Sequence, residues 1–192
     1  QNIIPDWCIV GEPTSTNTFG DVIKHGRRGS LNGVFRAFGV QGHVAYPESA
    51  VNPIHASLAA LFELTQEVWD EGCANFQPTS FQISNIHSGD GITNVIPAIL
   101  EAHFNFRYST KLHAEEIKTR TFGILEKHNI DYSIDWEHSG KPFLTISATL
   151  VSTLRAAISE TTGQLPELST TGGTSDGRFI STLTSEVVEF GP

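Results

Sequence analysis

The residues of this chain that could do chemistry lie mostly in loops. The first loop is GVQGHVAYPESAVNPI, residues 39–54, where His43 follows a glycine and precedes a Tyr46-Pro47 turn. An imidazole held in this way could move a proton or donate a hydrogen bond to a developing oxyanion. A strand-to-helix connector with an incidental histidine explains the same pattern, so this loop alone leaves both interpretations open.

Four more segments carry polar groups suited to binding. Glu12, in GEPT, follows the apolar run WCIV, and a carboxylate beyond a buried strand could bind a metal. Asn94 lies in the turn-rich GDGITNVIP, and Arg107 interrupts an alternating strand where it could bind a carboxylate. The stretch STTGGTSDGRF, residues 169–179, has paired glycines that let backbone N–H groups approach an anion. Ordinary turns, linkers and solvent-facing strand positions explain each of these signals when it is taken singly.

The composition narrows the class of protein. The chain has 192 residues, 39% of them hydrophobic, and a formal net charge of −9, so it should form a real core and should not favour nucleic acid or an anionic membrane. No apolar run is long enough to span a membrane. Two cysteines predict free thiols in a reducing cytoplasm, and the histidines lack the spacing of a compact zinc site.

Alternation and helical periodicity predict the elements that position these loops. Strands are expected at 7–10, within 21–40, at 79–86, at 99–108 and at 130–136. Helices are expected from Asn52-Pro53 to Gly72, over 114–128 and over 147–162. The first helix should turn one face inward, made of Ile54, Leu58, Leu61, Phe62, Thr65, Val68 and Trp69.

Between Ser30 and His138 the predicted order is strand, helix, strand, strand, helix, strand. This is the ferredoxin-like βαββαβ pattern, with one antiparallel sheet and two helices on one face. Residues 1–27 and 140–192 do not belong to it and predict part of a second, α/β domain. The fold class is therefore α/β with an α+β lid, residues 28–139, inserted between the two segments.

Taken together, the series VGEPT, GRRGSL, GHVAYPESAVNPI, TNVIP, FNFRYS and GGTSDGRF resembles the dinuclear-zinc aminoacylase and carboxypeptidase-type metallopeptidases. The resemblance covers essentially the whole chain. It is strongest to members that remove succinate from N-succinyl-L,L-diaminopimelate in lysine and diaminopimelate biosynthesis. It implies a cytoplasmic bacterial amide hydrolase with two zinc or cobalt ions, whose inserted lid forms a homodimer.

The resemblance also implies roles for single residues. Glu12 matches a metal ligand, and His43 matches a lid histidine that stabilises the oxyanion in the partner subunit's active site. Asn94 matches a substrate-binding residue of the same lid group. Other matches are to positions that hold substrate carboxylates: Arg27, Arg107, Ser139, Gly173 and Thr174.

The family's other metal ligands and its general-base glutamate have no match in this chain. Because the chain also begins at Gln1 and contains no methionine, we expect an internal fragment that binds no metal stably and is inactive alone. Two alternatives stay open at this point. One is a related deacylase or peptidase, such as an acetylornithine deacetylase, and the other is a non-catalytic dimerisation module.

Overall fold

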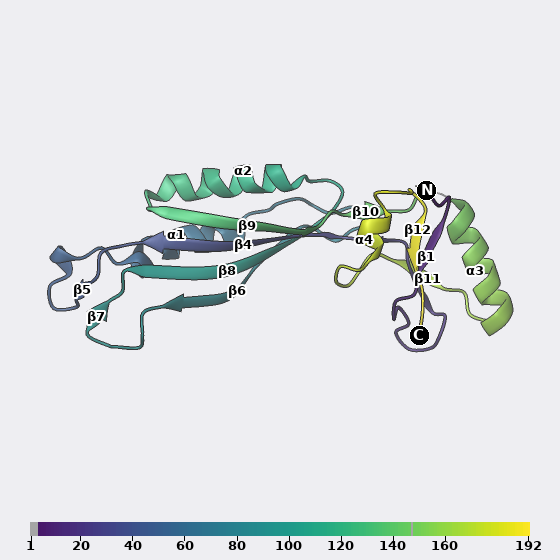
Figure 1. Cartoon of the computed structure of the whole chain (residues 1–192), viewed down its shortest axis with the longest axis horizontal. Helices are drawn as coiled ribbons and strands as arrows, with labels where there is room; N and C mark the ends of the chain where they lie inside the picture. Colours follow the sequence, from purple (N-terminus) through teal and green to yellow (C-terminus); the bar gives the residue numbers. More distant parts are fainter. Residues whose placement is uncertain (1–3, 147) are drawn as a thin grey trace.

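Strand β8 (Ile99–Tyr108) lies at the centre of the larger of two bodies in the computed structural model, which describes residues 4–146 and 148–192 (Figure 1). Its even-numbered residues from Leu100 to Tyr108 are buried, whereas its odd-numbered residues are partly or fully exposed. β8 pairs antiparallel with β4 (Gly29–Phe38) and with β6 (Ser80–Ser88). β4 also pairs with β9 (Tyr132–Gly140), giving the sheet order β6-β8-β4-β9.

Two helices cover one face of this sheet and leave the other face open. They are α1 (Pro53–Gln66) and α2 (Ala114–Leu125), the latter extended by the short 3-10 helix η2 (Glu126–His128). Asn52 caps α1, since its Oδ1 accepts hydrogen bonds from the backbone N–H of Ile54 and His55. The core between sheet and helices is strongly aromatic and includes Phe35, Trp69, Phe81, Phe104, Phe106 and Tyr108. The predicted ferredoxin-like lid is confirmed by this order and pairing.

The end and the inward face of α1 were predicted wrongly. The helix ends at Gln66 rather than near Gly72, and Leu58, Phe62 and Val68 are exposed rather than buried. The early end of the helix has a partner in α2, because the Arg120 guanidinium donates to the carbonyl oxygens of Val68 and Trp69. Trp69 then turns into the core, where its ring meets Phe106 edge-on at 4.6 Å.

The smaller body contains both termini (Figure 1). Its sheet has the order β1 (Cys8–Val10), β12 (Val187–Glu189), β2 (Val22–Lys24) and β11 (Glu167–Ser169). Helix α3 (Ala148–Thr162) packs on it through Leu150, Val151 and Ile158. A single-turn helix, α4 (Gly177–Ile180), precedes β12. Ser147, the predicted first residue of the third helix, and residues 1–3 lie outside the described residues.

The two bodies meet where the chain crosses between them. β3 (Gly26–Arg27) pairs with β10 (Phe143–Leu144) at this crossing, close to the domain boundaries predicted after residues 27 and 139. A second contact is made by Thr170, whose Oγ1 donates to the carbonyl oxygen of Asn75. At the opposite end, β5 (Gly42–His43), the 3-10 helix η1 (Pro47–Ser49) and β7 (Val95–Ile96) form a tip (Figure 1).

Cys8 and Cys73 are free thiols, as predicted. Among the residues that the structure describes, no helix combines the length and apolar character needed to cross a membrane.

Candidate functional site

The lid tip brings His43 and Asn94 together. β5 pairs antiparallel with β7, so that His43 lies opposite Val95, and the Val44 N–H donates to the Asn94 carbonyl oxygen at 3.0 Å. Both His43 and Asn94 are exposed. Gly42 packs closely on the same tip, because a Cβ on it would lie 2.7 Å from the Ala50 side chain.

The orientation of the His43 ring follows from its own loop. The backbone N–H of Ala45 donates to Nδ1 at 3.0 Å, which requires a lone pair on Nδ1. In the neutral imidazole the proton therefore sits on Nε2. The Tyr46 ring lies beside the imidazole, with 5.8 Å between the ring centroids. The exposed His43 ring could therefore donate a hydrogen bond to a group outside the lid.

Arg107 and Ser139 lie at the other end of the lid, on the two strands that flank β4. Asn105 lies near both, and its Nδ2 donates to Ser30 Oγ at 2.9 Å and to Asn32 Oδ1 at 2.7 Å. Asn32 Nδ2 in turn donates to Ser139 Oγ at 2.7 Å. Arg107 lies directly opposite Ser30 in the β4–β8 pairing, and its Nη1 is buried with no hydrogen-bond partner. A polar network and a cation with spare donors therefore share this surface.

Arg27 belongs to a different environment. Its Nε donates to Glu189 Oε2 at 2.7 Å, its Nη2 lies 2.5 Å from the same oxygen, and its Nη1 donates to the Thr171 carbonyl oxygen at 2.7 Å. Both members of this ion pair are buried, and Ser175 Oγ donates to the second Glu189 oxygen. Arg27 was predicted to bind a substrate carboxylate, but in this structure its guanidinium already binds the Glu189 carboxylate. The role of Arg27 toward substrate stays a prediction.

The loop with Gly173 and Thr174 is held beside Arg27. Gly172 has a φ of +103°, and a Cβ there would lie 2.4 Å from Arg27 Nη1, so only glycine fits. Thr174 Oγ1 accepts from Arg178 Nη1 at 3.1 Å, while Gly173 is exposed with open space around it. The helix after the loop, α4, has a single turn, so its dipole adds little positive potential for binding an anion at this loop.

Lys24 also holds this loop and was not among the predicted residues. Its Nζ donates to Ser169 Oγ at 2.9 Å and to Thr171 Oγ1 at 2.8 Å. Burial lowers the pKa of Lys24, and the positive charge of Arg27 lowers this pKa further. The only sequence signal for Lys24 was its position on a short strand, two residues before the GRRGSL motif.

Glu12 lies apart from any second ligand. Its backbone packs on the end of β12, where a Cβ on Gly191 would come within 2.6 Å of the Glu12 carbonyl oxygen. The described residues contain no cluster of three or more His, Cys, Asp or Glu side chains that could hold a metal ion. One carboxylate does not make a dinuclear site, so this chain by itself does not fit a pair of metal ions.

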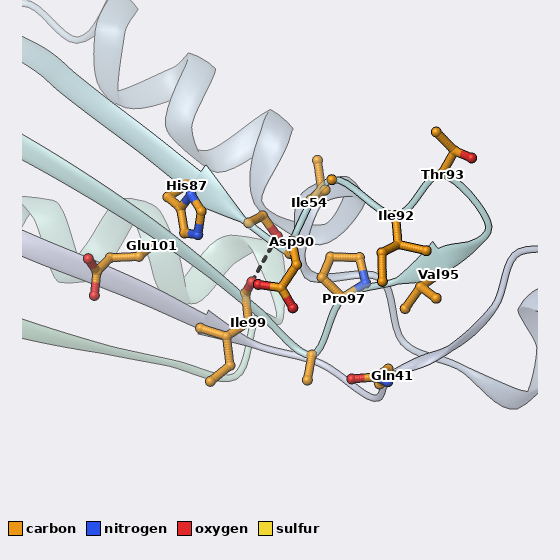
Figure 2. A pocket seen from close by; sticks show the side chains of 14 residues that line it. Gln41, Ile54, His87, Asp90, Ile92, Thr93, Val95, Pro97, Ile99 and Glu101 are labelled. Atoms are coloured by element: carbon orange, nitrogen blue, oxygen red, sulfur yellow. Dashed lines mark hydrogen bonds between the residues drawn. The ribbon is translucent and has the colours of Figure 1, made fainter.

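A cavity near the tip contains none of the predicted site residues (Figure 2). It measures about 700 Å³ and is lined by the loop between β6 and β7 together with Gln41 and Ile54. Ser88 Oγ donates to the Ile99 carbonyl oxygen at 2.8 Å across its floor. Figure 2 shows His87 and Glu101 on one side of it. We assign no chemistry to this cavity.

Comparison with known proteins places this geometry in context. A family model described as peptidase dimerisation domain, of the M20 group, matches residues 25–133. A protein of Thiobacillus denitrificans named succinyl-diaminopimelate desuccinylase is 59% identical over 187 residues, which are 97% of this chain and 48% of that protein. The chain thus spans about half the length of the curated relatives it matches.

Solved structures show the same fold. A tripeptidase from Staphylococcus aureus superposes with a TM-score of 0.78 at 18% identity, over 97% of this chain and 48% of that one. An M20 family metallo-carboxypeptidase from Sulfolobus solfataricus gives a TM-score of 0.70 at 13% identity, over 88% of this chain and 59% of that one.

Proposed function

Because this chain belongs to the M20 peptidase dimerisation domain family, we propose that it forms the lid and part of the catalytic domain of a metal-dependent amide hydrolase. The proposed reaction removes succinate from N-succinyl-L,L-diaminopimelate in the cytoplasm of a bacterium. The observation that carries this proposal is the 59% identity, along 97% of the chain, to a protein named for that reaction. Zinc or cobalt is the proposed metal, with all ligands except Glu12 supplied from outside these residues.

His43 is the proposed oxyanion donor. Amide hydrolysis places negative charge on the former carbonyl oxygen, and a preorganised N–H aimed at that oxygen lowers the barrier. Because the Ala45 N–H donates to Nδ1, Nε2 is the nitrogen that would donate to the oxyanion. Asn94, in the turn just before β7, would bind the same substrate from the tip.

Arg107 and Ser139 are the proposed carboxylate contacts at the base of the lid. Arginine binds carboxylates with two parallel hydrogen bonds, and the unpartnered Nη1 of Arg107 is available for such a bond. Ser139 is held in place by Asn32 and lies on the same open face. Thr174 and the Gly173 backbone would face this group from the smaller body.

The distance between the two ends of the lid supports a homodimer. β8 has ten residues, so the tip beyond Ile99 and the base at Arg107 lie roughly 30 Å apart. One lid therefore does not present His43 and Arg107 to one small substrate. A partner lid supplying His43 across the dimer resolves this, and the sheet order leaves the outer edge of β6 free to meet a second copy.

The neighbouring surface of α1 fits the same partner. Leu58 and Phe62 are four residues apart on the helix and are 60% and 66% exposed. A second copy would cover these apolar side chains together with the β6 edge.

The test uses a polypeptide that spans the full length of the relatives, loaded with zinc, and compares succinylated with acetylated substrates. We expect N-succinyl-L,L-diaminopimelate to be hydrolysed at least about a hundredfold more efficiently than N-acetylornithine, because an unfilled arginine site costs binding energy. The 192-residue chain alone should give no turnover. A preference for the acetyl substrate would replace the proposal with a related deacylase.

His43→Ala in the same polypeptide separates catalysis from assembly. We expect kcat to fall about 10²–10³-fold, the usual effect of removing one oxyanion donor. Metal content and the dimer mass measured by light scattering should not change. Tyr46→Phe is the matched control, since it keeps the ring beside His43. A near-normal kcat for His43→Ala would mean that the loop of residues 39–54 is only a connector between strand and helix.

A further inference from the structure

A loop of the lid contacts the part of the smaller body that contains Gly173 and Thr174. Residues 70–79, which precede β6, form this loop, and we call it the brace loop. The carbonyl oxygen of its Asn75 accepts a hydrogen bond from Thr170 Oγ1. Thr170 is buried and lies three residues before Gly173. The bond therefore joins the lid to the loop that would contact substrate.

The brace loop is held in shape by a carboxylate of its own. Asp70 Oδ1 accepts from the backbone N–H of Gly72 at 2.7 Å and of Thr79 at 3.1 Å, and Asp70 Oδ2 accepts from Thr79 Oγ1. Two backbone hydrogen bonds, of 2.8 and 3.2 Å, close the turn of residues 73–76. Hydrogen bonds to a carboxylate are roughly twice as strong as neutral ones. The Asn75 carbonyl is therefore fixed relative to the lid.

The smaller body holds the other side of the substrate-binding loop. Ser169 Oγ and Thr171 Oγ1 accept from Lys24 Nζ at 2.9 and 2.8 Å. The Thr171 carbonyl oxygen also accepts from Arg27 Nη1 at 2.7 Å. Thr170 lies between these two residues, and its hydroxyl bonds to the lid instead. Both bodies thus hold this loop, and Thr170 connects it to the lid.

Each body supplies part of the proposed carboxylate site. Arg107 and Ser139 come from the lid, whereas Gly173 and Thr174 come from the smaller body. The spacing between these pairs depends on the angle between the two bodies, where the chain crosses at β3 and β10. A second contact, outside those two strands, restrains this angle. Because substrate contacts need accurate placement, loss of the second contact would weaken substrate binding.

We propose that the brace loop positions the substrate-binding loop, and that Thr170 and Asp70 are positioning residues for the proposed reaction. Their side chains act through hydrogen bonds to the protein rather than to substrate. This inference rests on the proposed function for the identity of the substrate, a succinylated diamino diacid. It gives a role to residues 70–79, which contain none of the predicted site residues.

Steady-state kinetics of the full-length, zinc-loaded polypeptide test this role with N-succinyl-L,L-diaminopimelate. Thr170→Val keeps the shape of the side chain and removes the donor, so KM should rise about tenfold while kcat changes less than about threefold. Thr170→Ser keeps a hydroxyl and should restore most of the affinity. Thr121→Val is the matched control, because the buried Thr121 hydroxyl donates to the Ile117 carbonyl oxygen inside the lid. The KM of this control should stay within about twofold of wild type.

Hydrogen exchange tests the coupling between the bodies without any turnover. Asp70→Ala, a change in the lid, should speed exchange of the backbone amides of residues 171–174 in the smaller body at least about threefold. Thr170→Val should do the same. Exchange in β2 and β8 should not change, which excludes unfolding of either body. Asp70→Asn keeps one acceptor oxygen and should restore part of the protection.

Failure of the brace loop and failure of the proposed function give different results. A wild-type KM in Thr170→Val, or unchanged exchange at residues 171–174 in Asp70→Ala, would overturn the inference even if the wild-type polypeptide hydrolyses the substrate. Faster exchange at these residues in Asp70→Ala, in a polypeptide that does not hydrolyse the succinylated substrate, would keep the inference and reject the proposed function.

Discussion

The two bodies of this molecule are stabilised in different ways. The lid has strands of up to ten residues and a continuous aromatic core that includes Phe106 and Trp69. The smaller body has strands of two or three residues, a small apolar cluster around Ile23 and Val188, and a buried ion pair. The lid therefore depends on apolar burial, which is local to it, whereas the smaller body depends on a few specific polar contacts that each need both partners.

The size of the apolar core separates the two bodies further. The lid buries many more apolar side chains than the smaller body does. We therefore expect the lid to unfold at higher denaturant concentration than the smaller body. Trp69 and Trp136 report on the lid, because both contact Phe106, and Trp7 reports on the smaller body.

The largest effect should come from removing the centre of the lid core. Phe106 is fully buried, and Phe106→Ala should lower the free energy of unfolding of the lid by about 4 kcal/mol through lost burial and a cavity. Urea denaturation followed by lid tryptophan fluorescence measures this. Phe38→Ala, at an exposed position on β4, should cost less than about 1 kcal/mol. Equal losses at the two positions would mean that the lid has no distinct core.

A second effect should be confined to the smaller body. Glu189→Gln removes the charge that balances Arg27 in a fully buried position, and should destabilise this body by about 3 kcal/mol. Hydrogen exchange should show faster exchange in β2 and β12 with little change in β8. Glu167→Gln, exposed on the same sheet, is the control. Equal loss of protection in β8 would show that the two bodies unfold as one unit.

A smaller effect tests how local the stability of the lid is. Asn52→Ala removes the side chain that caps α1 and should cost about 1 kcal/mol. Asn52→Ser should restore most of the loss, since serine is also a good cap. The transition of the lid should shift while that of the smaller body stays in place, and a shift of both would argue against independent bodies.

The smallest effect should appear only at alkaline pH. Burial raises the pKa of Tyr108 from 10 to about 12, so the folded state holds the phenolic proton more tightly than the unfolded state does. The resulting stabilisation is complete below pH 10 and is lost as the pH rises toward 12. Urea denaturation of the lid at pH 9 and pH 11 should show this loss. Tyr108→Phe should abolish it, although it also removes the hydrogen bond to His138 Nε2.

The parts of the fold that could be predicted were those with local signals. Alternation along 99–108 predicted which side of β8 is buried, and the Asn52-Pro53 pair predicted the start of α1. The end of α1 could not be predicted in this way, since Arg120 fixes it from more than 50 residues away. Local periodicity continues through Val68 and Trp69 and contains no sign of that contact.

The candidate site shows the same limit. The partner of Arg27 is Glu189, 162 residues distant, and no spacing rule joins the two. The proximity of His43 to Asn94 was implied only by resemblance to relatives, since the β5–β7 pairing is two residues long.

The separation between tip and base has a mechanical consequence. The lid joins the smaller body at the crossing of β3 and β10, and His43 on β5 lies at the opposite end of the lid (Figure 1). With an arm of roughly 30 Å, a rotation of about 10° at the crossing displaces the imidazole by roughly 5 Å, more than the length of a hydrogen bond. The Arg27–Glu189 ion pair lies at that crossing. A small change at the Arg27–Glu189 ion pair would therefore displace the His43 imidazole at the other end of the molecule.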